Sequence, residues 1–420
     1  MHETPLTALV LSGGGARAAY QVGVLKALAR LRRTALGPAA RLRSPFGVIC
    51  GTSAGAINAA ALACRADHFD ASVEVIAKVW EDFSAEQVYR ADSLGVIRSG
   101  AQWLTMLSVG WVIARWRRAK PRSLLDNSPL ADLLQQMVPL ERLPSMLQQG
   151  HLHALAVTAS NYTSGEHFTF YDATEAIEPW LRSQRVAVQG PLTHAHLLAS
   201  SAIPFVFPAT LLEVAAAGKT TPQAGWFGDG SMRQTAPLSA AVHLGAQRLL
   251  IIGAGRMHEP AGRVVEAGAY PNLAQIAGHA MASIFLDALA VDIERMRRIN
   301  RTLALLPESA LADTPLRPLE ALVISPTERL DDIAARHLGA LPAPMRALLR
   351  GVGVGGRGRE ARGSALASYL LFEAPYTREL MALGEADTDA RRDEVLRFFG
   401  WDSISPMRRE QVSELDVSLP

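Results

Sequence analysis

The sequence predicts an α/β fold, namely a three-layer α/β/α sandwich with a mainly parallel central sheet and a mostly helical C-terminal extension. Two observations lead to this prediction. Short apolar runs alternate with longer amphipathic ones in the first half of the chain, as they do where crossover helices join parallel strands. The chain also has 420 residues, of which 49% are hydrophobic and 20% charged, and this composition excludes disordered and fibrous proteins.

The first expected elements are two strand-helix pairs. An apolar run at 8–11 predicts a strand and precedes a helical pattern at 16–32, and the same order recurs as a strand at 46–50 and a small-residue helix at 54–64. Further apolar runs predict strands at 153–159, 166–171, 225–227 and 248–253. Together these elements predict an α/β sandwich.

Helical patterns dominate two other parts of the chain. Residues 69–137 interrupt the alternation of strands and helices and predict a helical insertion. Residues 266–420 are mostly helical, with one predicted strand at 321–324, and their role is left open. The glycine- and arginine-rich stretch at 350–363 predicts a loop, and it is too short and too poor in aromatic residues to indicate an RNA site.

Charge and cysteine content narrow the class of protein. The 42 basic and 40 acidic residues give a net charge of +2, which provides no argument for a nucleic-acid partner. No acidic residue lies between Glu3 and Asp67, so this end is locally positive, either as a solvated helix face or as a surface that attracts anionic head groups. The two cysteines, Cys50 and Cys64, form neither a disulfide framework nor a zinc pattern, which favours a reducing compartment.

Targeting and membrane-spanning signals are not recognisable in the sequence. The first residues lack the basic and apolar regions of a signal peptide. The longest apolar candidate, residues 273–291, contains His279 and Asp287, so we expect no transmembrane helix. The expected location is therefore the cytoplasm, with peripheral contact to the inner membrane face as an additional expectation.

That additional expectation comes from a tryptophan-rich segment inside the helical insertion. An apolar run begins at Trp103 and is followed by a basic cluster. Tryptophan beside arginine is typical of segments that lie at a lipid surface, whereas a buried helix with a basic C-terminal end gives the same pattern, and both interpretations stay open. The candidate membrane-contact residues are Trp103, Trp111, Arg115, Trp116, Arg117 and Arg118.

Residues Gly51 to Gly55 form a G-x-S-x-G segment between a predicted strand and a predicted helix. In a nucleophile elbow the serine occupies a strained turn of this kind, and glycines on either side let the backbone bend without steric clashes. The hydroxyl then lies at a helix N-terminus, which favours developing negative charge. The segment therefore predicts Ser53 as a nucleophile, with Gly51 and Gly55 shaping the elbow.

A second glycine-rich segment, Gly13, Gly14 and Gly15 followed by Ala16 and Arg17, also lies between a strand and a helix. Consecutive glycines expose backbone N–H groups that bind an anion. One candidate is a nucleotide pyrophosphate, but the acidic residue that binds the ribose about twenty positions later is missing. The other is the tetrahedral oxyanion of acyl transfer, which suits a loop that accompanies a serine elbow.

Asp229 follows the predicted strand at 225–227, within a Gly-Asp-Gly-Ser segment. An Asp-Gly pair alone is most often a turn. Asp229 becomes informative because it follows the glycine loop and the elbow in the chain, and these three motifs together make a recurring set.

This set resembles the patatin-like phospholipases, over roughly residues 7 to 255. Their pattern is a G-G-G-x-R loop, then G-x-S-x-G, then D-G-[GA], and the sequence has Gly13 to Arg17, Gly51 to Gly55, and Asp229 to Ser231 in that order. The block Ala199 to Pro208 is similar to the A-S-x-A-x-P-x-x-F-P block that precedes the family's aspartate. Two residues depart from the pattern, since Ala18 stands for a common glycine and Ser231 for the last Gly or Ala, and both are small.

The resemblance implies a serine-dependent lipid acyl hydrolase that cleaves acyl esters of phospholipids or lysophospholipids. Ser53 would be the nucleophile, Asp229 its base, and the backbone of Gly13, Gly14 and Gly15 the oxyanion hole. No cofactor is implied. A carboxylate is normally a poor base for an alcohol, so Asp229 has to be desolvated to raise its proton affinity.

Two other functions stay open from the sequence alone. A conventional α/β-hydrolase would complete a Ser-Asp-His triad with His243, His258 or His279. A non-catalytic protein of the membrane surface would keep the fold without the chemistry. Neither the eleven histidines nor the carboxylates are clustered as metal ligands, so we expect no metal site. The oligomeric state is not indicated.

Overall fold

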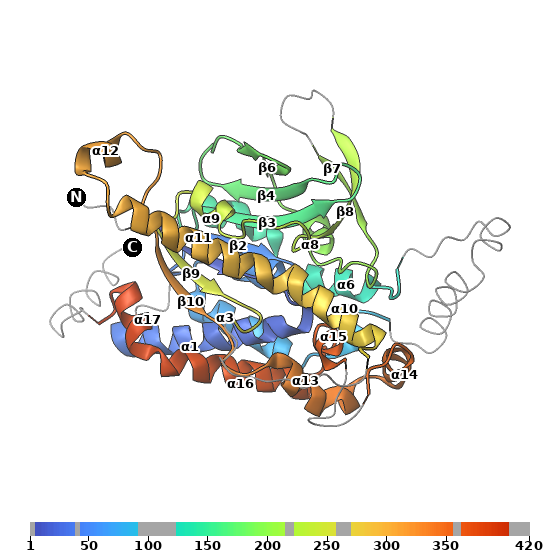
Figure 1. The fold of residues 1–420 in the computed structure, drawn as a ribbon. Coiled ribbons are helices and arrows are strands. Elements are labelled where there is room, and N and C mark those ends of the chain that lie inside the picture. Colours follow the sequence, from blue (N-terminus) through green and yellow to red (C-terminus); the bar gives the residue numbers. More distant parts are fainter. Residues whose placement is uncertain are drawn as a thin grey trace.

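A ten-stranded sheet forms the centre of the protein in the computed structural model (Figure 1). Five strands run parallel in the order β10, β9, β1, β2, β3, and helices connect β1 to β2, β2 to β3 and β9 to β10. These strands are β1 (Thr7–Leu11), β2 (Val48–Thr52), β3 (Ala154–Asn161), β9 (Arg248–Ile252) and β10 (Glu320–Ile324). The structure describes residues 5–37, 43–90, 123–214, 222–257, 270–355 and 363–402.

The remaining strands continue the sheet beyond β3. Strand β4 pairs antiparallel with β3 and parallel with β6, and β5 closes that edge. Strand β8 also pairs antiparallel with β3 and carries β7 on its other side. Their bounds are β4 (His167–Ala173), β5 (Leu181–Arg182), β6 (Arg185–Gln189), β7 (Thr210–Val214) and β8 (Gln223–Asp229).

Side chains of the central strands alternate between two hydrophobic cores, one on each face of the sheet. In β1, Leu9 and Leu11 belong to the larger core, whereas Ala8 and Val10 belong to the smaller one, and all four are almost completely buried. Because both faces are covered, the strands are apolar throughout, as in other buried parallel sheets. The protein is thus a three-layer α/β/α sandwich, and the predicted fold class is confirmed.

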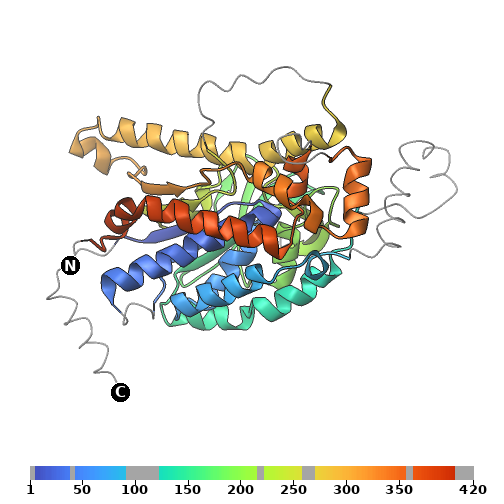
Figure 2. The same ribbon diagram turned by 90° about the horizontal axis from the view of Figure 1, so that it is seen from below.

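Helices from both ends of the chain form the layer over the larger core. Helices α1 and α16 lie side by side there, with α3 next to α1 (Figures 1 and 2). The helices that contribute to this core are α1 (Ala19–Leu36), α2 (Ala54–Ala63), α3 (Phe69–Glu81), α6 (Ser128–Met137), α7 (Leu143–Gln148), α8 (His194–Ser200), α10 (Leu273–Ala282), α13 (Leu330–His337), α14 (Ala343–Gly351), α15 (Ser364–Ser368), α16 (Ala374–Ala390) and α17 (Arg392–Phe399).

The smaller core is covered by α9 (Ser239–His243) and α11 (Ala288–Leu303). Helix α11 continues α10 through a π-helical turn, η5 (Ser283–Asp287), and the combined helix is long and apolar enough to cross a membrane by composition. In this structure Leu289, Ile293 and Met296 are buried in the smaller core, at the spacing of one helix face. The helix therefore serves here as a covering layer of the sandwich.

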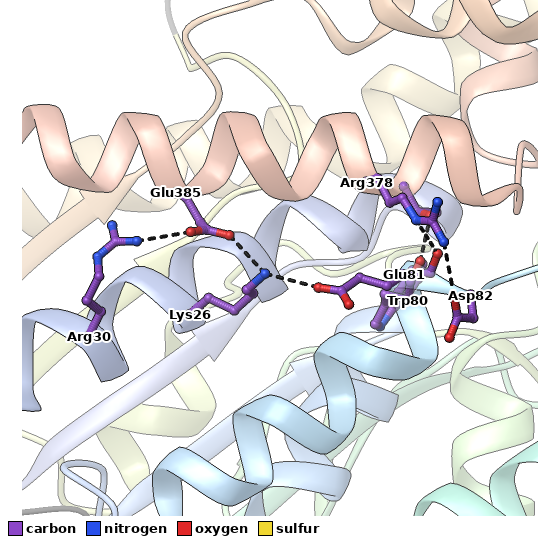
Figure 3. A network of polar contacts seen from close by, with 8 residues as sticks. Lys26, Arg30, Trp80, Glu81, Asp82, Arg378 and Glu385 are labelled. Carbon is purple, nitrogen blue, oxygen red and sulfur yellow. Dashed lines mark hydrogen bonds and ion pairs between the residues drawn. The ribbon is translucent and has the colours of Figure 1, made fainter.

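The region after residue 266 is built into the same sandwich. Its strand β10 is the edge strand beside β9, and its helix α16 is tied to α1 by ion pairs (Figure 3). Lys26 Nζ lies 3.0 Å from Glu385 Oε1, and Arg30 Nη1 lies 3.1 Å from Glu385 Oε2. Lys26 also reaches Glu81 of α3 at 3.0 Å, so one cation joins three helices.

Most predicted elements occur within a few residues of their predicted bounds. The helix predicted to begin at residue 16 starts as a 3₁₀ turn, η1 (Gly15–Ala18), before α1. The strand predicted at 46–50 lies at Val48–Thr52, so it ends directly at Ser53. The tryptophan-rich segment and its candidate membrane-contact residues lie outside the described residues.

Candidate active site

Ser53 stands in the turn between β2 and α2, and its backbone is strained. Its φ of 56° and ψ of −131° form a combination that residues other than glycine rarely adopt. The turn is tight, because a Cβ at Gly55 would lie 2.5 Å from the Ser12 carbonyl oxygen and one at Gly51 would lie 2.5 Å from Ala56 Cα. Both glycines of the motif are therefore required by close backbone approach, as a nucleophile elbow demands.

Strand β3 brings Asp229 to Ser53. Along β3, Thr158 pairs with Thr52 of β2, and the next residue, Ala159, pairs with Asp229 of β8. Strand β4 occupies the opposite side of β3 over the same residues, so β2 and β8 share one edge and meet end to end. The residue after Thr52 is Ser53, which consequently lies beside Asp229 although 176 positions separate them in the sequence.

The two side chains form a direct hydrogen bond in a buried site. Ser53 Oγ donates to Asp229 Oδ2 at 2.6 Å, and the backbone N–H of Ser231 donates to Asp229 Oδ1 at 2.8 Å. Ser53 is 1% exposed and Asp229 is fully buried. Burial raises the pKa of Asp229 to about 6, although the hydrogen bonds from Ser53 and Ser231 lower it in part. This carboxylate is thus a stronger base than an exposed aspartate.

A second serine, Ser200 at the end of α8, holds the elbow and the aspartate together. Its Oγ accepts a hydrogen bond from the Ser53 backbone N–H at 2.9 Å, and its carbonyl oxygen accepts one from Gly230 at 3.2 Å. The Asp229 N–H donates to the Ala202 carbonyl oxygen at 3.0 Å. Sequence reasoning gave Ser200 no role, although it stands inside the block at Ala199 to Pro208 that carried the resemblance.

The glycine loop presents three backbone N–H groups that are not used elsewhere. Ser12 and Ala16, on either side, donate to the carbonyl oxygens of Ile252 and Tyr369. Within the described part of the chain, the N–H groups of Gly13, Gly14 and Gly15 donate to no protein group, and all three glycines are buried. A buried N–H without an acceptor is costly, so a loop of this kind is suited to an anion that arrives with the substrate.

An apolar cavity opens beside Ser53. It holds ≈ 490 Å³ of empty space, mouth included, and Gly15 and Ser53 form part of its wall. Its other lining residues in the described ranges are uncharged, and most are large and apolar, among them Trp80, Phe83, Leu130, Phe207 and Phe372. These residues come from helices α2, α3 and α6, the segments after α3 and α8, and the C-terminal region. An apolar wall of this kind fits an aliphatic chain rather than a charged group.

The histidines considered for a triad do not enter this site in the described part of the chain. His243 stacks on Trp180 with ring centroids 4.6 Å apart, and it borders a different groove together with Arg182 and Arg317. His279 is exposed on α10, and His258 lies outside the described residues. Ser53 bonds the carboxylate of Asp229 directly, without an imidazole between them.

No metal centre is formed among the described residues, since no group of three or more His, Cys, Asp or Glu side chains is placed to hold an ion. The two cysteines are both free and buried. Burial raises the pKa of each of these thiols to about 12, so neither is a competing nucleophile at neutral pH.

Comparisons with solved structures give distant similarities. Human GIVD cytosolic phospholipase A2 shares 13% sequence identity with a TM-score of 0.45, over 94% of this chain and 60% of that chain. VipD from Legionella pneumophila shares 13% identity with a TM-score of 0.32, over 90% of this chain and 67% of that one. ExoU from Pseudomonas aeruginosa, in complex with SpcU, shares 15% identity with a TM-score of 0.25, over 91% and 71%. The chain thus spans about 60% of the length of the human phospholipase.

Family membership rests on a sequence model rather than on these structures. No curated protein matches the sequence. The family model for the patatin-like phospholipases matches residues 9–242, which is more than half of the chain. The matched range contains the glycine loop, the elbow and Asp229. The chain therefore belongs to the patatin-like phospholipases, a family of lipid acyl hydrolases.

Proposed function

We propose that the chain cleaves fatty acyl esters of phospholipids or lysophospholipids through an acyl-enzyme on Ser53, with Asp229 as the base. The observation that carries this proposal is the buried 2.6 Å hydrogen bond from Ser53 Oγ to Asp229 Oδ2. An alcohol bonded to a carboxylate of raised pKa has an acceptor for its proton at the moment of attack.

The first half of the reaction forms the acyl-enzyme. Ser53 Oγ attacks the ester carbonyl carbon while its proton passes to Asp229 Oδ2. The carbonyl oxygen becomes an oxyanion, which the N–H groups of Gly13, Gly14 and Gly15 stabilise. When the tetrahedral intermediate collapses, the bond to the alcohol oxygen breaks and Asp229 returns the proton to that oxygen, so the alcohol half of the lipid leaves.

The second half releases the fatty acid. A water molecule attacks the acyl carbon and gives a proton to Asp229, and the same loop stabilises the second oxyanion. Collapse breaks the bond to Ser53 Oγ, which takes the proton back from Asp229. No histidine is needed, because one carboxylate accepts and returns the proton in both halves.

The apolar cavity supports a lipid substrate. Its described lining residues carry no charge, so the acyl chain is the part of a phospholipid that it accommodates and the head group stays outside. We also propose that the segment from Trp103 to Lys120 contacts the lipid surface, since its tryptophans and basic residues suit an interface.

The test is hydrolysis of a mixed phospholipid and lysophospholipid extract, with mass analysis of the released fatty acids. The native chain should release fatty acid and should be labelled by a fluorophosphonate on Ser53. Ser53→Ala should lose both properties, and the rate of hydrolysis by Asp229→Asn should be lower by several orders of magnitude. Because the two residues act as one unit, the double variant should be no slower than either single one. Full hydrolysis by Ser53→Ala would refute the proposal.

A further inference from the structure

Arg17, two residues after the glycine loop, is a buried cation whose side-chain partners all belong to the C-terminal region. It is 3% exposed, and its guanidinium donates to Ser368 Oγ at 2.8 Å and to the Ala365 carbonyl oxygen at 3.3 Å. It also forms an ion pair with Asp331. An unpaired buried guanidinium would be strongly destabilising, so these partners fix the position of the Arg17 side chain.

Tyr369 contacts the glycine loop from the same side. Its ring lies under the Arg17 guanidinium, with Cζ 3.9 Å from the ring centroid, and its carbonyl oxygen accepts a hydrogen bond from Ala16 N–H at 3.0 Å. Gly15, at φ +55°, approaches so closely that a Cβ there would lie 2.3 Å from this carbonyl oxygen. The backbone of the loop therefore packs directly against Tyr369.

The π-helical turn η5 also contacts the loop. Phe285 of this turn stacks on Tyr369 with ring centroids 5.0 Å apart, and its ring would touch a Cβ at Gly13 at 2.9 Å. Departures from α-helical geometry of this kind often occur where a side chain has to be placed for function. Phe285 and Tyr369 thus form a stacked pair that packs against the loop, and both come from the part of the chain after residue 266.

We propose that the C-terminal region is a clamp that positions the oxyanion-binding amides of Gly13, Gly14 and Gly15, with Arg17, Asp331, Ser368 and Tyr369 as its positioning residues. None of these four side chains has to touch the substrate. Each acts through the glycine loop, where an error of a fraction of an ångström weakens hydrogen bonds to a developing oxyanion. This inference rests on the proposed function, because the amides matter only if the site carries out acyl transfer.

The same contacts show that the G-G-G-x-R loop depends on residues beyond 255, where the family resemblance ends. The ion pair and hydrogen bonds of Arg17 join positions 314 and 351 residues apart in the sequence. Removing the region after residue 266 would remove the described side-chain partners of Arg17 and the Tyr369 carbonyl that binds the loop.

The test compares Asp331→Asn with a matched control, Glu385→Gln. Each substitution keeps the shape of the side chain and removes one carboxylate charge that pairs with an arginine near the start of the chain. Glu385 pairs with Lys26 and Arg30 on α1 (Figure 3) and not with Arg17. Both variants therefore weaken the attachment of the C-terminal region, whereas only Asp331→Asn disturbs the clamp.

Two measurements on the full chain separate the possible outcomes. Amide hydrogen exchange of the peptide that contains residues 12–18 should become faster in Asp331→Asn and stay unchanged in Glu385→Gln. For a soluble short-chain ester, kcat should fall by about tenfold or more in Asp331→Asn, since one displaced oxyanion donor costs on the order of a hundredfold. KM should stay within about twofold of the native value, because Gly15 is in the glycine loop but the other described residues of the acyl-cavity wall lie outside it.

A second variant guards against a general loss of folding. Ser368→Ala removes one hydrogen bond from Arg17 to a neutral hydroxyl and should show the same pattern at smaller amplitude. Its effect should be less than additive with that of Asp331→Asn. Exchange and kcat equal to those of Glu385→Gln in both variants would overturn the clamp. If the native chain proves inactive while the exchange pattern holds, the proposed function fails and the clamp remains as a structural feature.

Discussion

Replacing Asp229 by asparagine should abolish hydrolysis and, at neutral or alkaline pH, stabilise the protein. Asp229 is fully buried, and no cation accounts for its altered pKa, which is raised from 3.8 to about 6 by desolvation. A carboxylate with a higher pKa in the folded state than in the unfolded state binds its proton more tightly after folding. Protonated Asp229 therefore makes its full contribution to the free energy of unfolding below about pH 4. That contribution is lost as the pH rises through about 6.

The size of the effect follows from that shift. A difference of about two pH units, at roughly 1.4 kcal/mol per unit, means that the ionised carboxylate disfavours the fold by about 3 kcal/mol at pH 8. Asparagine has the same shape, and its oxygen still accepts from Ser231 N–H while its amide donates to Ser53 Oγ. The net gain at pH 8 should therefore be about 2 kcal/mol once a weaker bond to Ser53 is allowed for. Active-site substitutions often stabilise a protein in this way.

The assay is denaturant unfolding of native protein and Asp229→Asn at about pH 8 and about pH 4.5. The variant should be more stable at the higher pH, and its advantage should shrink at the lower one, where the native carboxyl is mostly protonated in the fold. A variant that is less stable than the native protein at pH 8, or whose advantage grows as the pH falls, would refute this account of the site.

Four other outcomes are expected. The kcat/KM for a soluble ester should decline on the acid side with a midpoint near pH 6, as Asp229 becomes protonated, and a midpoint near 4 would exclude this base. Hydrolysis should survive excess EDTA, and activity that disappears with chelator and returns with metal would contradict a metal-free dyad. Neutralising Arg115, Arg117 and Arg118 together should weaken binding to anionic vesicles in co-sedimentation without changing hydrolysis of the soluble ester, at about 1 kcal/mol per charge, and unchanged binding would rule out that contact. Phe205 has a φ of 66° and is 72% exposed, so Phe205→Gly should raise the free energy of unfolding by about 1 kcal/mol. A lower melting temperature for this variant would argue against backbone strain at residue 205.

The local part of the site was predictable from the sequence. The strand, the elbow and the small-residue helix around Ser53 follow from short-range pattern, because apolar runs and flanking glycines specify the turn within a few residues. The fold class followed from the same alternation, and the structure confirms it. The boundary of β2 was misplaced by two residues, since Gly51 belongs to a residue type that is depleted in strands and interrupts the apolar run.

The long-range part was not predictable. Nothing in local pattern indicates that Asp229 pairs with Ala159, because antiparallel pairing between distant strands depends on the whole sheet. Arg17 carried no sign of its partner Asp331, and Trp80 and Phe372 are ordinary apolar residues until the fold places them in one cavity. Ser200 was noted only as part of the Ala199 to Pro208 block, because its contacts with the backbones of Ser53 and Gly230 form only in the fold.

The pairing of β8 with β3 has a consequence for how the protein loses activity. Strand β8 pairs with β3 through three residues, Asp229, Gly228 and Phe227, opposite Ala159 to Asn161, and its other edge is paired with β7. Because so few backbone pairs join β8 to β3, separating the β7–β8 pair from β3 costs less free energy than unfolding the whole sandwich. Opening would withdraw Asp229 and leave Ser53 in place without a base. Under increasing denaturant, hydrolysis should therefore vanish while the parallel strands and their helices are still intact, so turnover reports on one short strand contact rather than on the fold as a whole.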